Sequence, residues 1–160
     1  MDSYNFIDLD YSPTTILKEI YEVASKSPYY LSPSNVYRTD ITGKLRDNIQ
    51  HAINAEIADC GILRSSPKSI YQYHKDEFRQ CAINMLIIEP SNMHITKSMV
   101  GITPTVVPYR QDYFMMLNVT ELHMTTNKHV TDYRYVLSLG FKNNSYKDML
   151  DLHKQGLLLQ

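Results

Sequence analysis

Residues Ile70 to Asn84 read IYQYHKDEFRQCAIN, and residues Leu117 to Phe141 read LNVTELHMTTNKHVTDYRYVLSLGF. Both stretches consist of short runs rich in Ile, Val, Leu, Met and Tyr that polar residues interrupt, a composition typical of β-strands. The same pattern extends over 61–141 without a helical period between the runs. Many short strands without intervening helices predict a sandwich or barrel rather than a parallel sheet. The expected strands lie near 61–64, 69–75, 80–88, 93–97, 99–107, 112–119, 121–125 and 133–141.

Two amphipathic helices are expected before this β-rich region. The first begins at Ser12-Pro13, because proline is well tolerated at the first helical position, and ends near Ser25. The second begins within Thr42–Lys44 and ends at about Ala58, with an apolar stripe on one face and charged residues on the other. Residues 26–40 contain two prolines and no sustained period, so we expect a connecting loop there.

A third helix and a short lead-in strand complete the expected elements. Ser145 followed by Asp148 forms a capping-box pair that marks a helix start, and Gly156 marks the helix end. The apolar residues within 6–9 indicate an edge strand near the N-terminus. We therefore predict one domain over 1–160, mainly β, with flanking helices around a jelly-roll core. Its parts are a mostly helical segment 1–60, a β core 61–141 and a C-terminal helix 145–156.

The composition is that of an ordinary globular domain. Hydrophobic residues make up 43%, charged residues make up 21%, and the formal net charge of −1 gives no basic field for general nucleic-acid binding. Cys60 and Cys81 are too few and too far apart for a disulfide scaffold or a cysteine zinc site. The start MDSYNFIDLDY has no signal-peptide pattern, and no apolar stretch approaches the length of a membrane span. We expect a soluble, cytoplasmic protein that does not enter a membrane.

Thirteen tyrosines stand against four phenylalanines and no tryptophan. Tyrosine suits half-buried strand faces, where its ring packs and its hydroxyl reaches water, and it is also common at binding surfaces. The tyrosine-rich segment 27–37 is therefore expected to be the contact surface if the protein has assembly partners.

His74 and Asp76 form the first candidate metal-binding pair. Alternate residues of a strand project to the same face, so the two side chains point together if 70–76 is extended. An imidazole and a carboxylate side by side can ligate one face of a divalent cation. A second histidine from another strand would complete the two-histidine, one-carboxylate triad that suits Fe(II) oxygenases. The alternative for this H-x-D sequence is a half-buried histidine without a metal.

Arg134 is the expected anion-binding residue. It precedes the apolar run YVLSLGF, which places the base of its side chain in a sheet. A guanidinium with a buried base needs an anionic partner, and its planar fork suits a carboxylate. That partner is either a ligand or an acid of the chain such as Asp132.

The order of these residues resembles the 2-oxoglutarate/Fe(II)-dependent oxygenases. His74 and Asp76 are followed by His123, then by Asn127 and Arg134. This order is similar to the H-x-D pair, the distal histidine and the arginine of the prolyl and aspartyl/asparaginyl hydroxylase-like branch, with its small viral and bacterial relatives. HKDEFRQCAINMLI, LNVTELHMTTN and DYRYVLSLGF resemble the strands that carry those residues in the family. The similarity covers about half of the chain.

This resemblance implies an iron site, a cosubstrate site and an activity. His74, Asp76 and His123 would bind Fe(II), and Arg134 would bind the distal carboxylate of 2-oxoglutarate. The implied enzyme is a dioxygenase that hydroxylates or demethylates its substrate and releases succinate and carbon dioxide. The implied core is the double-stranded β-helix, a cupin-like jelly roll.

Other residues are candidates for lining the cosubstrate pocket. Tyr71 and Tyr73 share one face of an extended strand, opposite to Gln72 and His74, so they cannot all point at the metal. The remaining cosubstrate candidates are Asn84, Asn127 and Ser138.

His129 and His94 are alternatives to His123 as the distal ligand. His123 is preferred because it follows a strand-like run and has an asparagine four residues later, as in the family. The chain departs from the family at two positions. Thr125 stands where an apolar residue is common, and Val136 stands where some members have a hydroxyl residue.

Three functions are consistent with the sequence. The first is a 2-oxoglutarate-dependent enzyme acting on a small molecule, a peptide or a nucleobase. The second is a non-catalytic jelly-roll structural or assembly protein, such as a virion component, in which His74 and His123 would lie far apart. The third is a cupin-like metalloenzyme that does not use 2-oxoglutarate or depend on Arg134. Four basic residues are either entrance-lining or solvated edge charges: Lys68, Lys75, Arg79 and Arg110.

Overall fold

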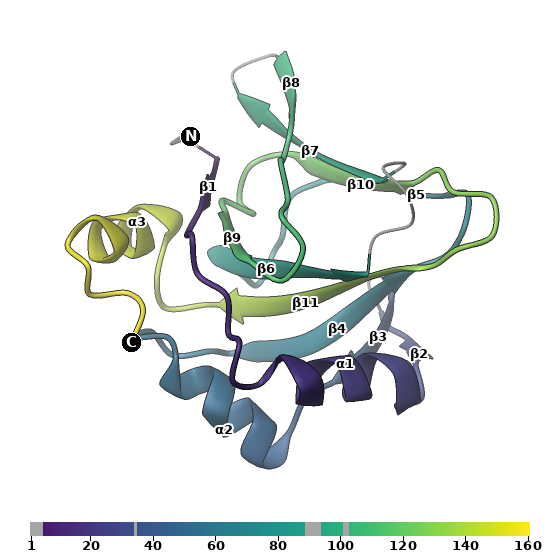
Figure 1. Ribbon diagram of the computed structural model, residues 1–160. Helices are drawn as coiled ribbons and strands as arrows, with labels where there is room; N and C mark the ends of the chain where they lie inside the picture. The colour runs from purple at the N-terminus through teal and green to yellow at the C-terminus, as the bar shows by residue number, and fades with distance from the viewer. Residues whose placement is uncertain (1–4, 34, 89–93, 101–102) are drawn as a thin grey trace.

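Two antiparallel sheets face each other in the computed structural model, which describes residues 5–33, 35–88, 94–100 and 103–160 (Figure 1). Within these residues the larger sheet has seven strands in the order β1-β9-β6-β11-β4-β3-β2, and the smaller sheet has four in the order β5-β10-β7-β8. This arrangement confirms the predicted mainly β jelly roll with flanking helices. The strands are β1 (Phe6–Asp8), β2 (Tyr30–Leu31), β3 (Tyr37–Asp40), β4 (Asp59–Ser65), β5 (Ser69–His74), β6 (Cys81–Ile88), β7 (His94–Val100), β8 (Thr103–Val106), β9 (Phe114–Leu117), β10 (His123–Asn127) and β11 (Arg134–Phe141).

Helices cover the outer face of the larger sheet. Figure 1 shows α1 (Leu17–Lys26) and α2 (Gly43–His51) on the face turned away from the smaller sheet, and α3 (Tyr146–Lys154) near one end of it. Ile20 of α1 and Ile49 of α2 are fully buried in one apolar cluster with the strand residues beneath them. Burial of this face is the main source of folding free energy. No helix in the described part of the chain has the length and apolarity needed to cross a membrane.

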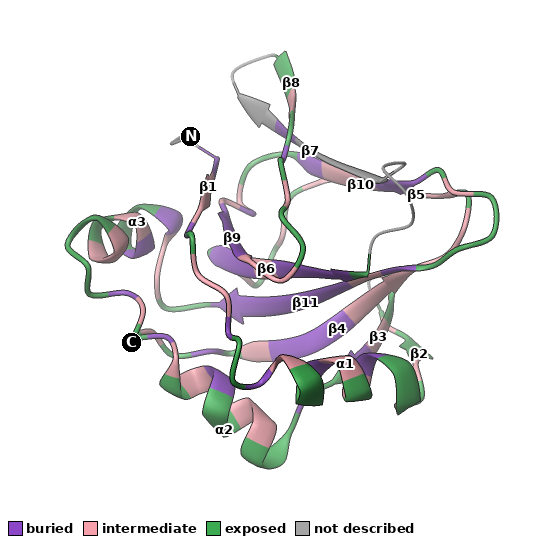
Figure 2. Ribbon diagram, in the orientation of Figure 1, coloured by how far each residue is buried: buried purple, intermediate pink, exposed green. Residues whose placement is uncertain are grey.

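The inner face of the larger sheet carries the side chains that matter for function. Alternate residues of β11 face opposite ways, as a pleated strand requires. Leu137 and Leu139 join the helix-covered core, while Val136 and Ser138 line a cavity between the two sheets. Figure 2 shows the neighbouring strands β9, β6 and β11 as largely buried, so the cavity has a well-packed floor.

The eight strands expected between 61 and 141 are all present, with ends displaced by a few residues. The largest displacement is between β7 and β8, because β7 continues to Val100 and β8 begins at Thr103. The expected start of β7, at residue 93, lies outside the described residues. The expected N-terminal edge strand is confirmed as β1, which pairs with β9 at one edge of the larger sheet.

Both N-terminal helices are shorter than predicted. The first starts at Leu17 rather than at Ser12-Pro13, because the backbone N–H of Ile16 bonds back to the Pro13 carbonyl in a tight turn. The second ends at His51 rather than near Ala58. The Gln50 side chain donates to the carbonyls of Ile53 and Ala55 and accepts from the N–H of Ile57. These bonds replace the helical ladder, so the chain turns while its isoleucines stay buried.

The loop prediction for 26–40 is wrong, because this segment contains β2 and β3. Tyr37 to Asp40 pair with β4 over four residues, and Tyr30 and Leu31 pair with β3. Strands this short carry no readable period and form because an edge of β4 is available to them. The segment 1–60 therefore contributes strands to the larger sheet as well as helices.

The predicted cap of the last helix is confirmed. The Ser145 hydroxyl accepts from the backbone N–H of Asp148 at 3.1 Å, and the Asp148 carboxylate accepts from the Ser145 N–H at 2.9 Å. Gly156 has a φ of 70°, the left-handed conformation that ends a helix and that glycine adopts without strain.

Replacement of the capping serine should destabilise the domain. Ser145→Ala removes the acceptor for a helix N–H and should lower the free energy of unfolding by about 1 kcal/mol. Urea denaturation followed by circular dichroism measures the change. Ser25→Ala, near the end of α1, serves as the control, because it removes a hydroxyl that bonds back to the Tyr21 and Glu22 carbonyls of its own helix. Equal losses in the two variants would contradict a specific capping role.

Candidate metal centre

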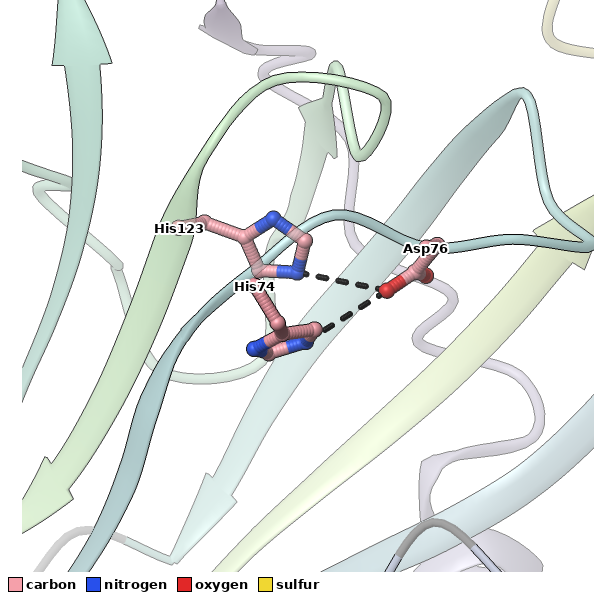
Figure 3. Close-up of side chains that lie close together, drawn as sticks. All are labelled: His74, Asp76 and His123. Atoms are coloured by element: carbon pink, nitrogen blue, oxygen red, sulfur yellow. Dashed lines mark ion pairs between the residues drawn. The ribbon is translucent and has the colours of Figure 1, made fainter.

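The centre of the site consists of His74, Asp76 and His123 (Figure 3). His74 ends β5, His123 begins β10, and the two residues pair directly across the strands. Their ring centroids lie 4.2 Å apart. Asp76 follows β5 in a loop, and its N–H donates to the Val119 carbonyl at 2.9 Å. Strand pairing therefore brings together side chains that are far apart in the sequence.

The three side chains converge on one point. Asp76 Oδ1 lies 3.4 Å from His74 Nε2 and 3.5 Å from His123 Nε2. One donor atom from each residue lies within 4.8 Å of the others. A divalent metal with bonds of about 2.1 Å at right angles needs neighbouring donors about 3.0 Å apart. The residues therefore fit a single metal ion after small movements, with its remaining coordination positions open.

Backbone carbonyls orient both imidazoles for this purpose. His74 Nδ1 donates to the Gln72 carbonyl at 2.8 Å, and His123 Nδ1 donates to the Glu121 carbonyl at 2.9 Å. With its proton on Nδ1, a neutral ring presents the lone pair of Nε2 to the Asp76 oxygen. Lone pairs that face one another repel unless a proton or a metal ion lies between them. The geometry of the centre thus favours a bound cation.

The surroundings keep Asp76 ionised. Burial raises the pKa of its carboxyl, but hydrogen bonds from His123 and His74, donated when their Nε2 atoms carry protons, and the charge of Arg79 lower it further, so that the pKa lies well below its usual range. Burial lowers the pKa of His74, and its hydrogen bond with Asp76 outweighs this and raises it. An anionic carboxylate beside two imidazoles is a donor set that attracts a divalent cation.

The tyrosines of β5 do not follow the predicted alternation. The register between β5 and β10 shifts by one residue, since His123 pairs with His74 while Thr125 pairs with Tyr71. This β-bulge brings the Tyr71 ring to 4.2 Å from the His74 ring, centroid to centroid. Tyr73 is 39% exposed and lines neither cavity of the site. The prediction that Tyr71 and Tyr73 share a face opposite to His74 is therefore wrong.

A small cavity of about 80 Å³ adjoins the histidines between the sheets. Arg134 lines it, is 4% exposed, and has its guanidinium carbon 5.3 Å from the centroid of the Tyr109 ring. Asn84 also lines it, donates to the Tyr109 hydroxyl at 3.3 Å, and has a buried Oδ1 without a hydrogen bond. Ser138 and Tyr71 complete this wall. The buried guanidinium of Arg134, beside the amide of Asn84 and the phenol of Tyr109, suits an oxygen-rich anion.

Asn127 has a different place from the one predicted. Its side-chain amide donates to the carbonyls of Ser65 and Asp132 at 3.1 and 2.9 Å, and its oxygen accepts from the N–H of His129 at 3.1 Å. The residue is fully buried and does not line the small cavity. Backbone groups occupy its side chain, so it shapes the β10–β11 connection instead of contacting a cosubstrate.

His129 does not reach the centre, and the backbone of the other rival, His94, lies at the far end of β10. His129 Nδ1 accepts from the N–H of Asp132 at 3.0 Å, and its Nε2 lies 3.5 Å from the carboxylate of the same residue. His94 pairs with Asn127 at the opposite end of β10 from His123. Among the described residues, the group of side chains with metal-ligand geometry contains His123.

Arg79, expected from the sequence only as an entrance-lining or solvated edge charge, lines both cavities, and Tyr109, which was not expected near the site, lines the small one. Arg79 Nε donates to Asp76 Oδ2 at 2.6 Å, and Nη1 donates to the Ser138 hydroxyl at 2.9 Å. In the sequence, only its position three residues after Asp76 indicated that Arg79 could contact that carboxylate. Tyr109 gave no signal, because the turn after β8, and not a motif, brings it to the cavity.

A larger cavity of about 600 Å³ is lined by His74 and Asp76 and shares Tyr71, His74 and Arg79 with the small cavity. Lys75 and Phe78 line it, and Phe78 is 76% exposed. The turn between β2 and β3 forms part of the opposite wall, so the tyrosine-rich segment contributes to the entrance. Lys68 and Arg110 line neither cavity.

Removal of one ligand should abolish metal binding. We expect His123→Ala to lose Co(II) binding, because two donors and solvent cannot hold the ion in a single site. Isothermal titration calorimetry under anaerobic conditions, together with the visible spectrum of Co(II), measures the loss. His129→Ala is the matched control, since it removes an imidazole six residues away whose contacts are with Thr131 and Asp132 of its own turn. Retained binding in His123→Ala, or its loss in His129→Ala, would contradict the assignment.

Comparison with solved structures identifies proteins of the same architecture. A viral collagen prolyl hydroxylase from Paramecium bursaria Chlorella virus-1, solved with 2-oxoglutarate, aligns with a TM-score of 0.58 and 14% identity over 86% of this chain and 94% of its own. A Pseudomonas putida prolyl-4-hydroxylase aligns with a TM-score of 0.61 and 11% identity, over 88% and 92% of the two chains.

A third similar structure is HygX from Streptomyces hygroscopicus, solved with nickel and 2-oxoglutarate bound. It aligns with a TM-score of 0.59 and 10% identity over 88% of this chain and 84% of its own. No family model and no curated protein sequence matches the chain. At these identities the likeness concerns the fold. The chain has the double-stranded β-helix fold of the 2-oxoglutarate/Fe(II) oxygenases, and it carries a candidate His-Asp-His metal triad.

Proposed function

We propose that this protein is an Fe(II)- and 2-oxoglutarate-dependent dioxygenase that hydroxylates or demethylates its substrate. The observation that carries the proposal is the convergence of His74, Asp76 and His123 beside a cavity that Arg134 lines. A metal triad alone would fit several enzyme classes. The combination of an open-sided triad with a buried guanidinium in the adjoining cavity favours a carboxylate cosubstrate.

The residues of the small cavity have complementary tasks in this proposal. Arg134 binds the distal carboxylate of 2-oxoglutarate through its planar fork, which β11 and the Tyr109 ring hold in place. Asn84, with an unbonded buried oxygen, orients the ligand or a water that accompanies it. Tyr71 packs against His74 and limits the space beside the metal. The walls are mostly apolar, which strengthens these polar contacts by excluding water.

When bound, Fe(II) and 2-oxoglutarate would supply the chemistry together with dioxygen, one oxygen atom of which goes to the substrate and the other to succinate as carbon dioxide leaves. The chain provides the geometry for that chemistry. His74 and His123 keep their Nε2 atoms directed at the metal through the Nδ1 bonds to backbone carbonyls. Asp76 supplies the negative charge that offsets part of the charge of the ion.

The larger cavity is the proposed substrate entrance. It shares His74, Asp76 and Tyr71 with the centre, and its remaining walls are a mixture of charged and apolar groups. We propose that the substrate, whether a small molecule, a peptide or a nucleobase, enters between the 75–79 loop and the turn between β2 and β3. The segment 27–37 would then contact the substrate or a protein that carries it.

The structure disfavours one of the two other functions. For a purely structural jelly-roll protein we expected His74 and His123 to lie far apart, whereas their rings lie 4.2 Å apart with the donor atoms converging on a carboxylate. A cupin-like metalloenzyme without 2-oxoglutarate shares the triad, and it differs in having no use for Arg134.

Loss of the buried guanidinium should separate cosubstrate binding from metal binding. We expect wild-type protein with Fe(II) and 2-oxoglutarate to develop a weak visible charge-transfer band in the absence of oxygen. Arg134→Ala should raise the 2-oxoglutarate concentration needed for half of this band by at least about tenfold, since a charged hydrogen-bonded contact contributes about 1.5–3 kcal/mol. Its Co(II) affinity should stay close to that of the wild type.

Arg46→Ala is the control for this measurement. Arg46 bonds only to the Ile57 carbonyl, on the helix-covered side, so its loss should leave the band unchanged. Addition of oxygen to the wild-type complex should release succinate slowly, even without a substrate. Metal binding without any response to 2-oxoglutarate would favour the cupin-like alternative, and no metal binding at all would rule out both enzymes.

A further inference from the structure

Asp76 is the one member of the triad that lies outside a strand. His74 and His123 belong to β5 and β10, whose ladder fixes their backbones. Asp76 sits two residues after the end of β5, and a single backbone bond to Val119 ties its main chain. The carboxylate of a loop residue can adopt several rotamers and can present either of its two oxygens. A further contact is therefore needed to fix which oxygen faces the histidines.

Arg79 contacts the oxygen that the histidines do not use. Its Nε donates to Asp76 Oδ2 at 2.6 Å, while Asp76 Oδ1 faces both imidazoles at 3.4 and 3.5 Å. Its Nη1 donates to the Ser138 hydroxyl of β11 at 2.9 Å. The side chains of Arg79 and Asp76 are only 22% and 10% exposed. The loop carboxylate is thereby connected to the central strand of the larger sheet.

The backbone of β11 leaves room for this arrangement. A Cβ atom at Gly140 would lie 2.3 Å from Cδ of Arg79 and 3.2 Å from Cβ of Asp59. The Arg79 stem therefore crosses β11 where the strand has no side chain. An alanine at this position would displace the stem without removing any charge, which provides a second way to test its position.

We infer that Arg79 is a positioning residue that makes Asp76 bind the metal through Oδ1 alone. By occupying Oδ2, it prevents the carboxylate from turning or from binding through both oxygens. One-oxygen ligation leaves three positions open on a six-coordinate ion, enough for a two-atom chelate and one further ligand. The inference rests on the metal centre of the proposed function, but it does not depend on 2-oxoglutarate turnover.

An effect of the charge of Arg79 and an effect of its contact with Asp76 would change the metal affinity in opposite directions. If Arg79 acted only through its positive charge, its removal would strengthen the binding of a divalent cation, because a repulsive charge would be lost. If it positions Asp76, its removal should weaken binding. Loss of such an orienting contact to a metal ligand typically lowers metal affinity about 10- to 100-fold.

Arg38 provides the matched control. It lines the same large cavity, its side chain is 16% exposed, and it crosses Gly61 as Arg79 crosses Gly140. Its guanidinium, however, pairs with the carboxylate of Asp59, which is not a ligand, at 2.8 Å. Arg38→Ala therefore removes a comparable charge from the cavity without freeing Asp76.

The experiment is an anaerobic Co(II) titration of the full-length protein, followed by calorimetry and by the visible absorption of the bound ion. We expect Arg79→Ala to bind Co(II) about 10- to 100-fold more weakly. Its absorption bands should also shift, because Asp76 can then bind through two oxygens. Arg79→Lys should recover part of the affinity by supplying one donor, and Gly140→Ala should reproduce the band shift. Arg38→Ala should bind as tightly as wild type or more tightly.

Each outcome has a distinct meaning. Unchanged or tighter binding in Arg79→Ala, with wild-type bands, would overturn the inference. An equal loss in Arg38→Ala would also overturn it, since the effect would then belong to the cavity as a whole. Circular dichroism of the metal-free variants checks that they are folded, and Arg79→Lys keeps the test valid if an alanine variant is not. Failure of the wild type to bind Co(II) would instead contradict the proposed function.

Discussion

The site depends above all on the antiparallel pairing of β5 with β10. Direct pairing of His74 with His123 brings two imidazoles together from opposite ends of a long stretch of sequence. A slip of one residue would turn one of the rings to the other face of the sheet. The bulge next to this pair shifts the register by one residue and brings the Tyr71 ring against the His74 ring. The larger sheet then supplies Arg134 and Ser138 from β11, so the centre lies where the two sheets meet.

Much of this arrangement could be predicted from the sequence, for identifiable physical reasons. Strand composition in 61–141 is dense enough that every expected strand is present. Ser145 and Asp148 form a helix cap that depends only on these two residues and their spacing, so it can be recognised in the sequence. The resemblance to the 2-oxoglutarate/Fe(II) oxygenases, carried by the order of His74, Asp76, His123 and Arg134, implied which side chains would gather. The structure brings His74, Asp76 and His123 together as a candidate metal site.

The failures share one cause, because each depends on side-chain or strand contacts that the spacing of apolar and polar residues does not encode. The bulge in β5 has no local signature, so strict alternation misplaced Tyr71 relative to Tyr73. Gln50 ends α2 by bonding to the backbone beyond it, although the apolar spacing continues as far as Ile57. Asn127 has the expected place in the sequence, yet backbone groups of neighbouring loops take its side chain. Arg79 acquires its role only when β11 passes beneath it.

The edge position of β5 has a consequence for the thermodynamics of the domain. Within the described residues β5 has only β10 as a neighbour, so the ladder between them is what holds this strand in the sheet. An ion coordinated by His74, Asp76 and His123 would cross-link the strand, its following loop and β10. Occupancy then couples to folding, contributing about 2.7 kcal/mol when the free metal exceeds its dissociation constant a hundredfold. The concentration of free metal would in this way set the stability of the pairing between β5 and β10.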